Sequence, residues 1–212
     1  TISSSERNKF KAEIKRITLL NLKPKYKTSI QNTLKKTEHL KKLQEKYDLK
    51  DSLSNLKKLI DDCKKYGTKP FAILARHGFI AISFLRSFEK LQILSKKDIS
   101  KFLMTIKTIS SDFIRDIEKF SPKNKSNFLK KYGHLRPGTY DILSEKYSDS
   151  FEFRKKMTIK KIYNKKFVLS KKKKSKLNRH LKNFKIHFSA NEVLDYCEKA
   201  IIAREYSKFI FT

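Results

Sequence analysis

The chain of 212 residues is poor in the residue types on which several protein classes depend. It has four Gly, four Pro and no Trp, and so few turn-forming residues argue against a β-rich fold or a disordered linker. Its two cysteines, Cys63 and Cys197, form no CxxC pair and have no His at ligand spacing, which argues against a structural zinc site or another metal centre. We expect both thiols to be buried and reduced.

Long apolar runs are also lacking. No segment approaches the ~18 apolar residues that a membrane span needs, and the first residues lack the apolar core of a signal peptide. We therefore expect a cytoplasmic protein with no membrane span. The chain starts at Thr1 rather than Met, and its last helical pattern stops without a cap, so we expect an excised or proteolysed piece of a larger protein.

Acidic residues are scarce, since 52 Lys and Arg face 21 Asp and Glu and the net charge is +31. Such an excess is typical of nucleic-acid-binding proteins. However, only nine of the basic residues are Arg, whose planar guanidinium binds phosphates and bases bidentately, and the 43 Lys are spread along every segment. A basic helical module that binds nucleic acid or another polyanion is therefore the alternative interpretation, not the first.

Apolar residues at helical spacing are abundant, and they predict an all-α, multi-helix fold over residues 1–212 with an ordered Gly/Pro loop near 133–144. The expected helices lie near residues 5–21, 34–47, 53–63, 70–94, 96–117, 122–132, 171–184 and 190–206. We interpret the weakly patterned segment 145–168 as an irregular excursion. Strands are not indicated anywhere.

Local signals mark several helix ends. SKKD at 95–98 and SANE at 189–192 are capping boxes, in which a Ser and an acidic residue satisfy each other's backbone N–H groups. Gly67 suits a left-handed C-terminal position and Pro70 suits a first helical turn, so we expect a break between two helices there.

No nucleotide-binding or hydrolytic motif is present, but the run KYGHLRPGTYDILS at 131–144 holds half of the glycines. Its RPG tripeptide favours a rigid turn that can aim His134, Arg136, Tyr140 and Asp141 into a shared space. These side chains supply an imidazole, an anion-binding fork, a phenol and a carboxylate. The alternative is a tight connection between helices in which His134 and Asp141 only satisfy backbone groups.

Three further residues stand out on the expected helices. Segment 70–94 is apolar on nearly all sides, which predicts a buried central helix, and it contains Arg76 and His77. A buried Arg needs a carboxylate, a phosphate or a ligand as partner. A His there is either a satisfied core residue or a site residue, and Arg204 in AREY is either a salt-bridged surface residue or part of the same site.

The segments FAILARHGFIA, KYGHLRPGTYDILSEKY and IIAREYSKFIFT, in this order, make the chain resemble a known family. It is similar to the helical middle region of phosphoenolpyruvate-synthase-like, or pyruvate phosphate dikinase-like, phosphotransferases. The resemblance is strongest to the capsule-associated branch that includes L-glutamine kinase, and rifampin phosphotransferase is more distant. GHLRPGTYD is its most specific part, and the first fifty residues are only generically similar.

This resemblance implies a helical domain that binds the acceptor, placed between an ATP-grasp domain and a swivelling phosphohistidine domain of the same polypeptide. ATP and Mg²⁺ would be bound outside this chain, which alone should be inactive, and L-glutamine is the acceptor implied by the nearest branch. The resemblance places His134 and Arg136 in a catalytic role, and Arg76, His77, Tyr140, Asp141 and Arg204 around the acceptor. None of the five His lies in a phosphohistidine motif.

These assignments give a mechanistic hypothesis. His134 would orient or deprotonate the acceptor, and Arg136 and Arg76 would stabilise the charge of the transferred phosphoryl group. A third interpretation is a structural linker whose loop only supports the neighbouring domains.

Overall fold

The computed structural model describes residues 3–47, 52–136, 141, 143–149 and 166–211, and over these ranges the chain is all-α without strands, which confirms the predicted fold class. Most of the predicted excursion at 145–168 lies outside the described residues. The helices are α1 (Ser4–Leu22), α2 (Ile30–Gln44), α3 (Ser52–Asp62), α4 (Lys69–Lys90), α5 (Lys96–Thr105), α6 (Ile109–Glu118), α7 (Lys125–Tyr132), α8 (Lys171–Asn183) and α9 (Ala190–Phe211), with a π-helical turn at Cys63–Thr68 and a 3₁₀ turn at Pro122–Asn124.

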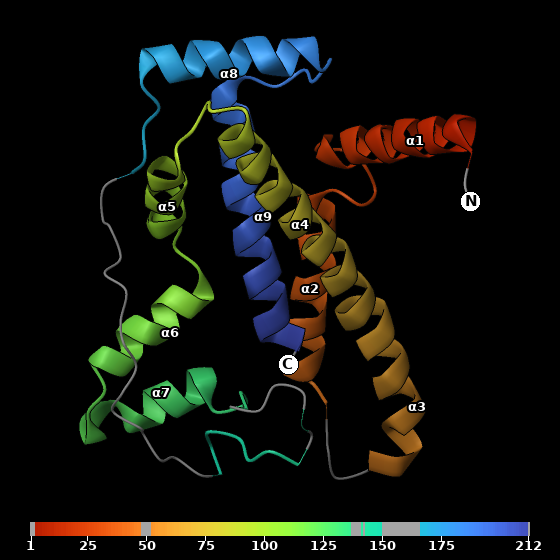
Figure 1. Ribbon diagram of the computed structural model, residues 1–212. Coiled ribbons are helices and arrows are strands. Elements are labelled where there is room, and N and C mark those ends of the chain that lie inside the picture. Colours follow the sequence, from red (N-terminus) through yellow and green to blue (C-terminus); the bar gives the residue numbers. More distant parts are fainter. Residues whose placement is uncertain (1–2, 48–51, 137–140, 142, 150–165, 212) are drawn as a thin grey trace.

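The centre of the molecule is an antiparallel pair of long helices, α4 and α9, with α2 packed against both (Figure 1). Two contacts show that α4 and α9 run in opposite directions. Phe71 near the start of α4 stacks on Phe211 at the end of α9, and further along the pair the Cys197 thiol of α9 donates to the Ala81 carbonyl of α4. Helix α8 crosses one end of the pair, and α5, α6 and α7 follow one another along one flank. Apolar side chains of α4, α5, α8 and α9 form the main core.

The expected break between Gly67 and Pro70 is wrong, because the helix continues from α3 through the π-helical turn into α4. Gly67 has no positive φ. A Cβ at this position would lie 2.7 Å from Cδ2 of Phe211 and 3.2 Å from Cδ2 of Leu40. Glycine therefore serves the close approach of α2 and α9 and not a helix end. Pro70 therefore lies inside a continuous helix, directly after the π-helical turn, where its missing N–H removes one backbone hydrogen bond.

The single helix expected over 96–117 is two helices, α5 and α6, separated by residues 106–108. Thr108 caps a new helix by accepting from the Ser111 N–H at 3.3 Å, so the chain turns although the apolar spacing continues. Both predicted capping boxes are present: Ser95 with Asp98, and Ser189 with Glu192.

Helix α4 buries one face rather than nearly all sides, as its exposed Phe79 shows. The continuous helix Asn55–Lys90 is the one candidate in the described ranges that is long and apolar enough to cross a membrane, although no run of that kind was expected. Core helices pass the same test of length and composition, and α4 packs against α2 and α9. Of the two free cysteines, Cys197 is buried as expected, whereas Cys63 is exposed.

The buried face of α2 carries two threonines that differ in one respect. Thr37 Oγ1 lies 3.4 Å from Ser207 Oγ, whereas Thr33 Oγ1 is buried without a hydrogen-bond partner among the described residues. Thr33→Val keeps the shape and removes the unsatisfied hydroxyl, so we expect it to raise the free energy of unfolding by about 1 kcal/mol in urea denaturation. Thr37→Val is the matched control and should lower it by a similar amount; equal effects at both positions would contradict the assignment.

Candidate functional site

The loop after α7 is closed by its own backbone. Gly133 and Leu135 accept from Ser148 and Tyr147 through N–H···O bonds of 3.0 Å each, so the two ends of the loop lie side by side. A Cβ on Gly133 would collide with the Leu129 carbonyl oxygen and would lie 3.3 Å from Cβ of Ser148. The first glycine of the motif therefore permits the end of α7 to pack directly against the returning segment of the loop at Ser148.

Two predicted site residues brace this closed loop. Arg136 Nη1 donates to the Ser144 carbonyl across the turn. Asp141 Oδ1 accepts from the Leu143 N–H at 2.9 Å, an arrangement typical of an Asx turn. Both side chains thus hold the loop backbone, a role that the alternative interpretation of the motif gave to Asp141. Tyr140 and the Pro-Gly pair lie outside the described residues.

His134 connects the loop to α9. Its Nε2 donates to the Phe209 carbonyl at 3.1 Å, and its ring stands edge-on to the Phe209 ring at 4.8 Å between centroids. Because a carbonyl can only accept, the neutral imidazole must carry its proton on Nε2 and its lone pair on Nδ1. The ring is exposed, so Nδ1 is an atom that can take a proton from a bound molecule.

A cluster of aromatic side chains packs against the two ends of the loop. Phe113 of α6 lies 4.9 Å from Tyr132, 5.7 Å from Phe128 and 5.8 Å from Tyr147, measured between ring centroids. The buried Tyr132 donates its hydroxyl to Asp116 at 2.7 Å. Burial raises the pKa of Tyr132. Burial also acts to raise the pKa of Asp116, but hydrogen bonds from Lys131 and Tyr132 outweigh it and hold that pKa below its ordinary value. The ends of the loop are therefore held in place by this packing and by the Tyr132–Asp116 hydrogen bond.

His77 is a satisfied core residue in this structure. Its Nε2 donates to the Thr28 carbonyl and its Nδ1 accepts from the Tyr196 hydroxyl, both at 2.8 Å. Burial lowers the pKa of His77, against the opposing effect of the Thr28 carbonyl. The neighbouring Arg76, expected to be buried and paired, is exposed instead.

This environment of His77 predicts a pH dependence of stability. Its folded pKa lies below the value of about 6.5 that an unfolded chain has, so the unfolded state binds the proton first as the pH falls. The contribution of His77 is complete above pH ~6.5 and is lost below it, by at most about 1.4 kcal/mol per pH unit. The free energy of unfolding, measured with urea at several pH values from 7.5 to 5, should fall less steeply with decreasing pH in His77→Gln than in wild type. The same pH dependence in both proteins would contradict the assignment.

Arg204 lies where α9 meets α4 and α6. Its stem packs on Gly78, where a Cβ would lie 2.8 Å from Arg204 Cδ, and its guanidinium carbon lies 5.7 Å from the centroid of the exposed Phe79 ring. Arg204 Nη1 is 3.9 Å from Glu205, which accepts from Ser110 of α6 at 2.8 Å. Arg204 is half-exposed, so it combines a salt-bridged surface position with access to an anion.

The predicted site residues thus fall into two groups. His134, Arg136 and Asp141 share the closed loop, whereas Arg76, His77 and Arg204 belong to the α4–α9 pair. In the described ranges no hydrogen bond, ion pair or ring contact joins the two groups directly. They share α9 as a common support, because Phe209, which holds His134, follows Arg204 by one and a half turns.

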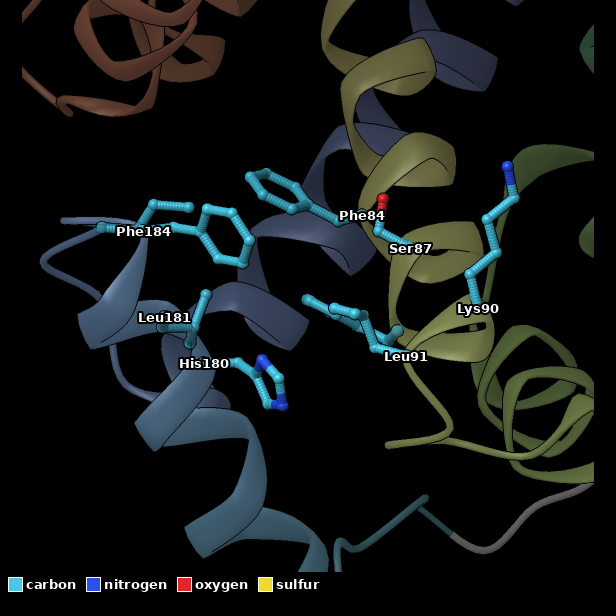
Figure 2. A pocket seen from close by; sticks show the side chains of 9 residues that line it. Phe84, Ser87, Lys90, Leu91, His180, Leu181 and Phe184 are labelled. Carbon is cyan, nitrogen blue, oxygen red and sulfur yellow. The ribbon is translucent and has the colours of Figure 1, made fainter.

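Two cavities contain none of the predicted site residues. The first, about 370 Å³, lies between the C-terminal ends of α4 and α8 and is lined by Phe84, Leu91, Leu181 and Phe184 among others (Figure 2). The second, about 580 Å³, lies between α4 and α5. The sequence offered only a weak signal for the first, namely large apolar residues at two helix ends. The described residues include no group of three or more His, Cys, Asp or Glu placed to hold a metal ion.

The chain matches no protein-family model, no curated protein and no solved structure. The resemblance to the phosphotransferases therefore depends on the sequence motifs alone.

Proposed function

We propose that this chain is the acceptor-binding helical domain of an ATP-dependent phosphotransferase that works through a phosphohistidine relay. ATP and Mg²⁺ would be bound by other domains of the same polypeptide, and L-glutamine is the first acceptor to test. The proposal rests on the motif resemblance together with one structural observation, the closed loop that holds His134. It assigns no phosphocarrier role to any His of this chain.

The closed loop supports the proposal because its geometry suits an acceptor site. The Arg136 bond to Ser144 and two backbone bonds fix the ends of the turn, while His134 stays exposed with its tautomer set by Phe209. A general base must be held in one orientation with a free lone pair, and the tethered, exposed His134 suits this role through Nδ1.

Arginine side chains would neutralise the transferred phosphoryl group. Arg136 remains the first candidate because it belongs to the loop, and Arg204 lies on the helix that holds His134. Arg76 is exposed on α4 and stays a prediction. His77 has both ring nitrogens engaged, so in this proposal it supports the α4–α9 pair and leaves the acceptor to other residues.

The proposal is tested with the full-length polypeptide and ATP that is radiolabelled in its β- and γ-phosphates. We expect the label to appear on the protein, and L-glutamine to remove it with formation of a labelled small molecule. Related amino acids would show whether glutamine is the acceptor. If no label is taken up, the phosphotransferase assignment is wrong; if the label forms but no amino acid removes it, the acceptor class is wrong.

A second candidate function is binding of nucleic acid or another polyanion, and α8 is the observation that favours it. This helix contains seven Lys or Arg and no Asp or Glu, and its first turn carries four consecutive lysines. Lysines at a helix N-terminus are unfavourable because they face the positive end of the helix dipole. The charge of Lys173 is compensated by Asp98, whose Oδ2 lies 2.6 Å from Lys173 Nζ. A bound polyanion would compensate the charges of other lysines in this turn.

Salt dependence separates this second candidate from the first. A polyanion-binding protein should bind a random-sequence oligonucleotide with an affinity that falls steeply as salt is raised, because each phosphate contact releases a counterion. Replacing Lys171, Lys172 and Arg179 of α8 with Gln should reduce the steepness. Binding that vanishes near physiological salt, or that is unchanged in the triple variant, would contradict a role for α8.

A further inference from the structure

The cavity between the ends of α4 and α8, here called the α4–α8 groove, leaves large apolar side chains at the surface. Phe184 is 54% exposed and Leu91 is 39% exposed, although each stands at the end of a well-packed helix. Figure 2 shows Phe84 of α4 and Phe184 of α8 pointing toward each other across the groove, with Leu181 beside them. A concave apolar surface of this kind is typical of a binding site.

Both walls of the groove are fixed by the same kind of helix end. Gln92 after α4 and Lys185 after α8 have φ values of 52° and 57°, the left-handed conformation that non-glycine residues rarely adopt. The next residues turn back, so that Ile93 and Ile186 donate to the Phe88 and Leu181 carbonyls at 2.9 Å. The helix ends are therefore capped, and the groove is formed before any partner binds.

The charge around the groove selects the partner. Lys90, a cation, and His180, a hydrogen-bonding side chain, line the groove, and α8 has no carboxylate, while Glu89 of α4 lines the other cavity. A second copy of this chain would bring the same net charge of +31, so self-association through the groove is opposed. An acidic surface is attracted instead.

We propose that the α4–α8 groove binds an amphipathic, acidic helix of a partner protein. The cavity of about 370 Å³ takes two large apolar side chains one helical turn apart, and Asp or Glu residues beside them face Lys90 and His180. The apolar pair supplies most of the affinity, and the charges supply orientation and the rate of encounter. This inference is independent of the proposed phosphotransferase function.

Fluorescence anisotropy with the 212-residue chain tests the inference. The probe is a labelled 16-residue helical peptide of Glu and Ala that carries two Leu four residues apart. Two control peptides have Ser in place of both Leu, or Lys in place of Glu. We expect the probe to bind at least about tenfold more tightly than either control, at a salt concentration that screens non-specific attraction.

Variants of the protein locate the binding. Phe184→Ser and Leu91→Ser should each weaken probe binding at least about fivefold, whereas Phe10→Ser, which removes a 67% exposed ring on α1, should leave it unchanged. Circular dichroism melting would show that all three remain folded. Equal effects of Phe184→Ser and Phe10→Ser would overturn the proposal. So would equal binding of the Leu and Ser peptides, or a groove that binds dodecanoate but no peptide.

Discussion

His134→Gln in the full-length polypeptide is expected to slow phosphoryl transfer to the acceptor by about 100- to 10,000-fold while phosphohistidine formation continues at its normal rate. The Gln amide can still donate to the Phe209 carbonyl, so the tether between the loop and α9 is kept. It cannot accept a proton as imidazole Nδ1 does. Rapid quenching of the labelled enzyme, with and without acceptor, measures the two half-reactions separately.

The matched control is His187→Gln, which changes an exposed His outside the loop and should alter neither half-reaction. Transfer by His134→Gln within tenfold of wild type would contradict the role of His134 as base. Loss of both half-reactions would show that the loop acts on the assembly of the domains and not on the acceptor. His134→Ala, which also removes the tether, should transfer no faster than His134→Gln.

His77→Ala is expected to lower the free energy of unfolding by about 3–5 kcal/mol. The substitution opens a cavity and leaves two groups without partners, the Tyr196 hydroxyl and the Thr28 carbonyl. The loss should be large because the His77 ring joins α4 to α9 and to the segment before α2 at one buried point. Urea unfolding followed by far-ultraviolet circular dichroism measures it.

Two further variants show how much of this loss comes from the hydrogen bond between His77 and Tyr196. Tyr196→Phe removes only the hydroxyl and should cost about 1–2 kcal/mol, and the double variant with His77→Ala should cost less than the sum of the two. A loss below about 1 kcal/mol for His77→Ala would contradict its structural role. A stable variant with impaired acceptor binding would instead support the site role first predicted for His77.

The parts of the fold that could be predicted from sequence are those with a local cause. The starts of α5 and α9 follow from Ser95 and Ser189, whose side chains accept from backbone groups three residues on. The boundary between α5 and α6 has a local cause as well, the Thr108 cap, but continuous apolar spacing obscured it. Gly67 could not be interpreted locally, because its reason is contact with Phe211 and Leu40, far away in sequence.

In the candidate site, too, features with a local cause could be predicted and features that depend on distant contacts could not. The loop could be singled out from its Gly and Pro residues, and Arg136 joins its two ends through the Ser144 carbonyl. Which face of α4 is buried could not be read from a helix with apolar residues all round, so Arg76 was wrongly placed inside. His77 is buried as expected, but its partners Thr28 and Tyr196 come from segments that no sequence pattern links to it. The groove depends on two helix ends that meet only in the folded chain.

The position of α9 has a consequence for how the chain folds. Its residues form hydrogen bonds with Ala81 across 116 residues of sequence, and with Gln44 and Thr37 across 166 and 170 residues. Closing such long loops adds little to the equilibrium cost, about 0.6 kcal/mol for each doubling of length, but it slows the search for the native contacts. We therefore expect this all-α chain to fold more slowly than helical bundles built from sequence neighbours. Until α9 docks, α2 and α4 expose their apolar faces, which makes the unfinished chain prone to aggregate and a substrate for chaperones.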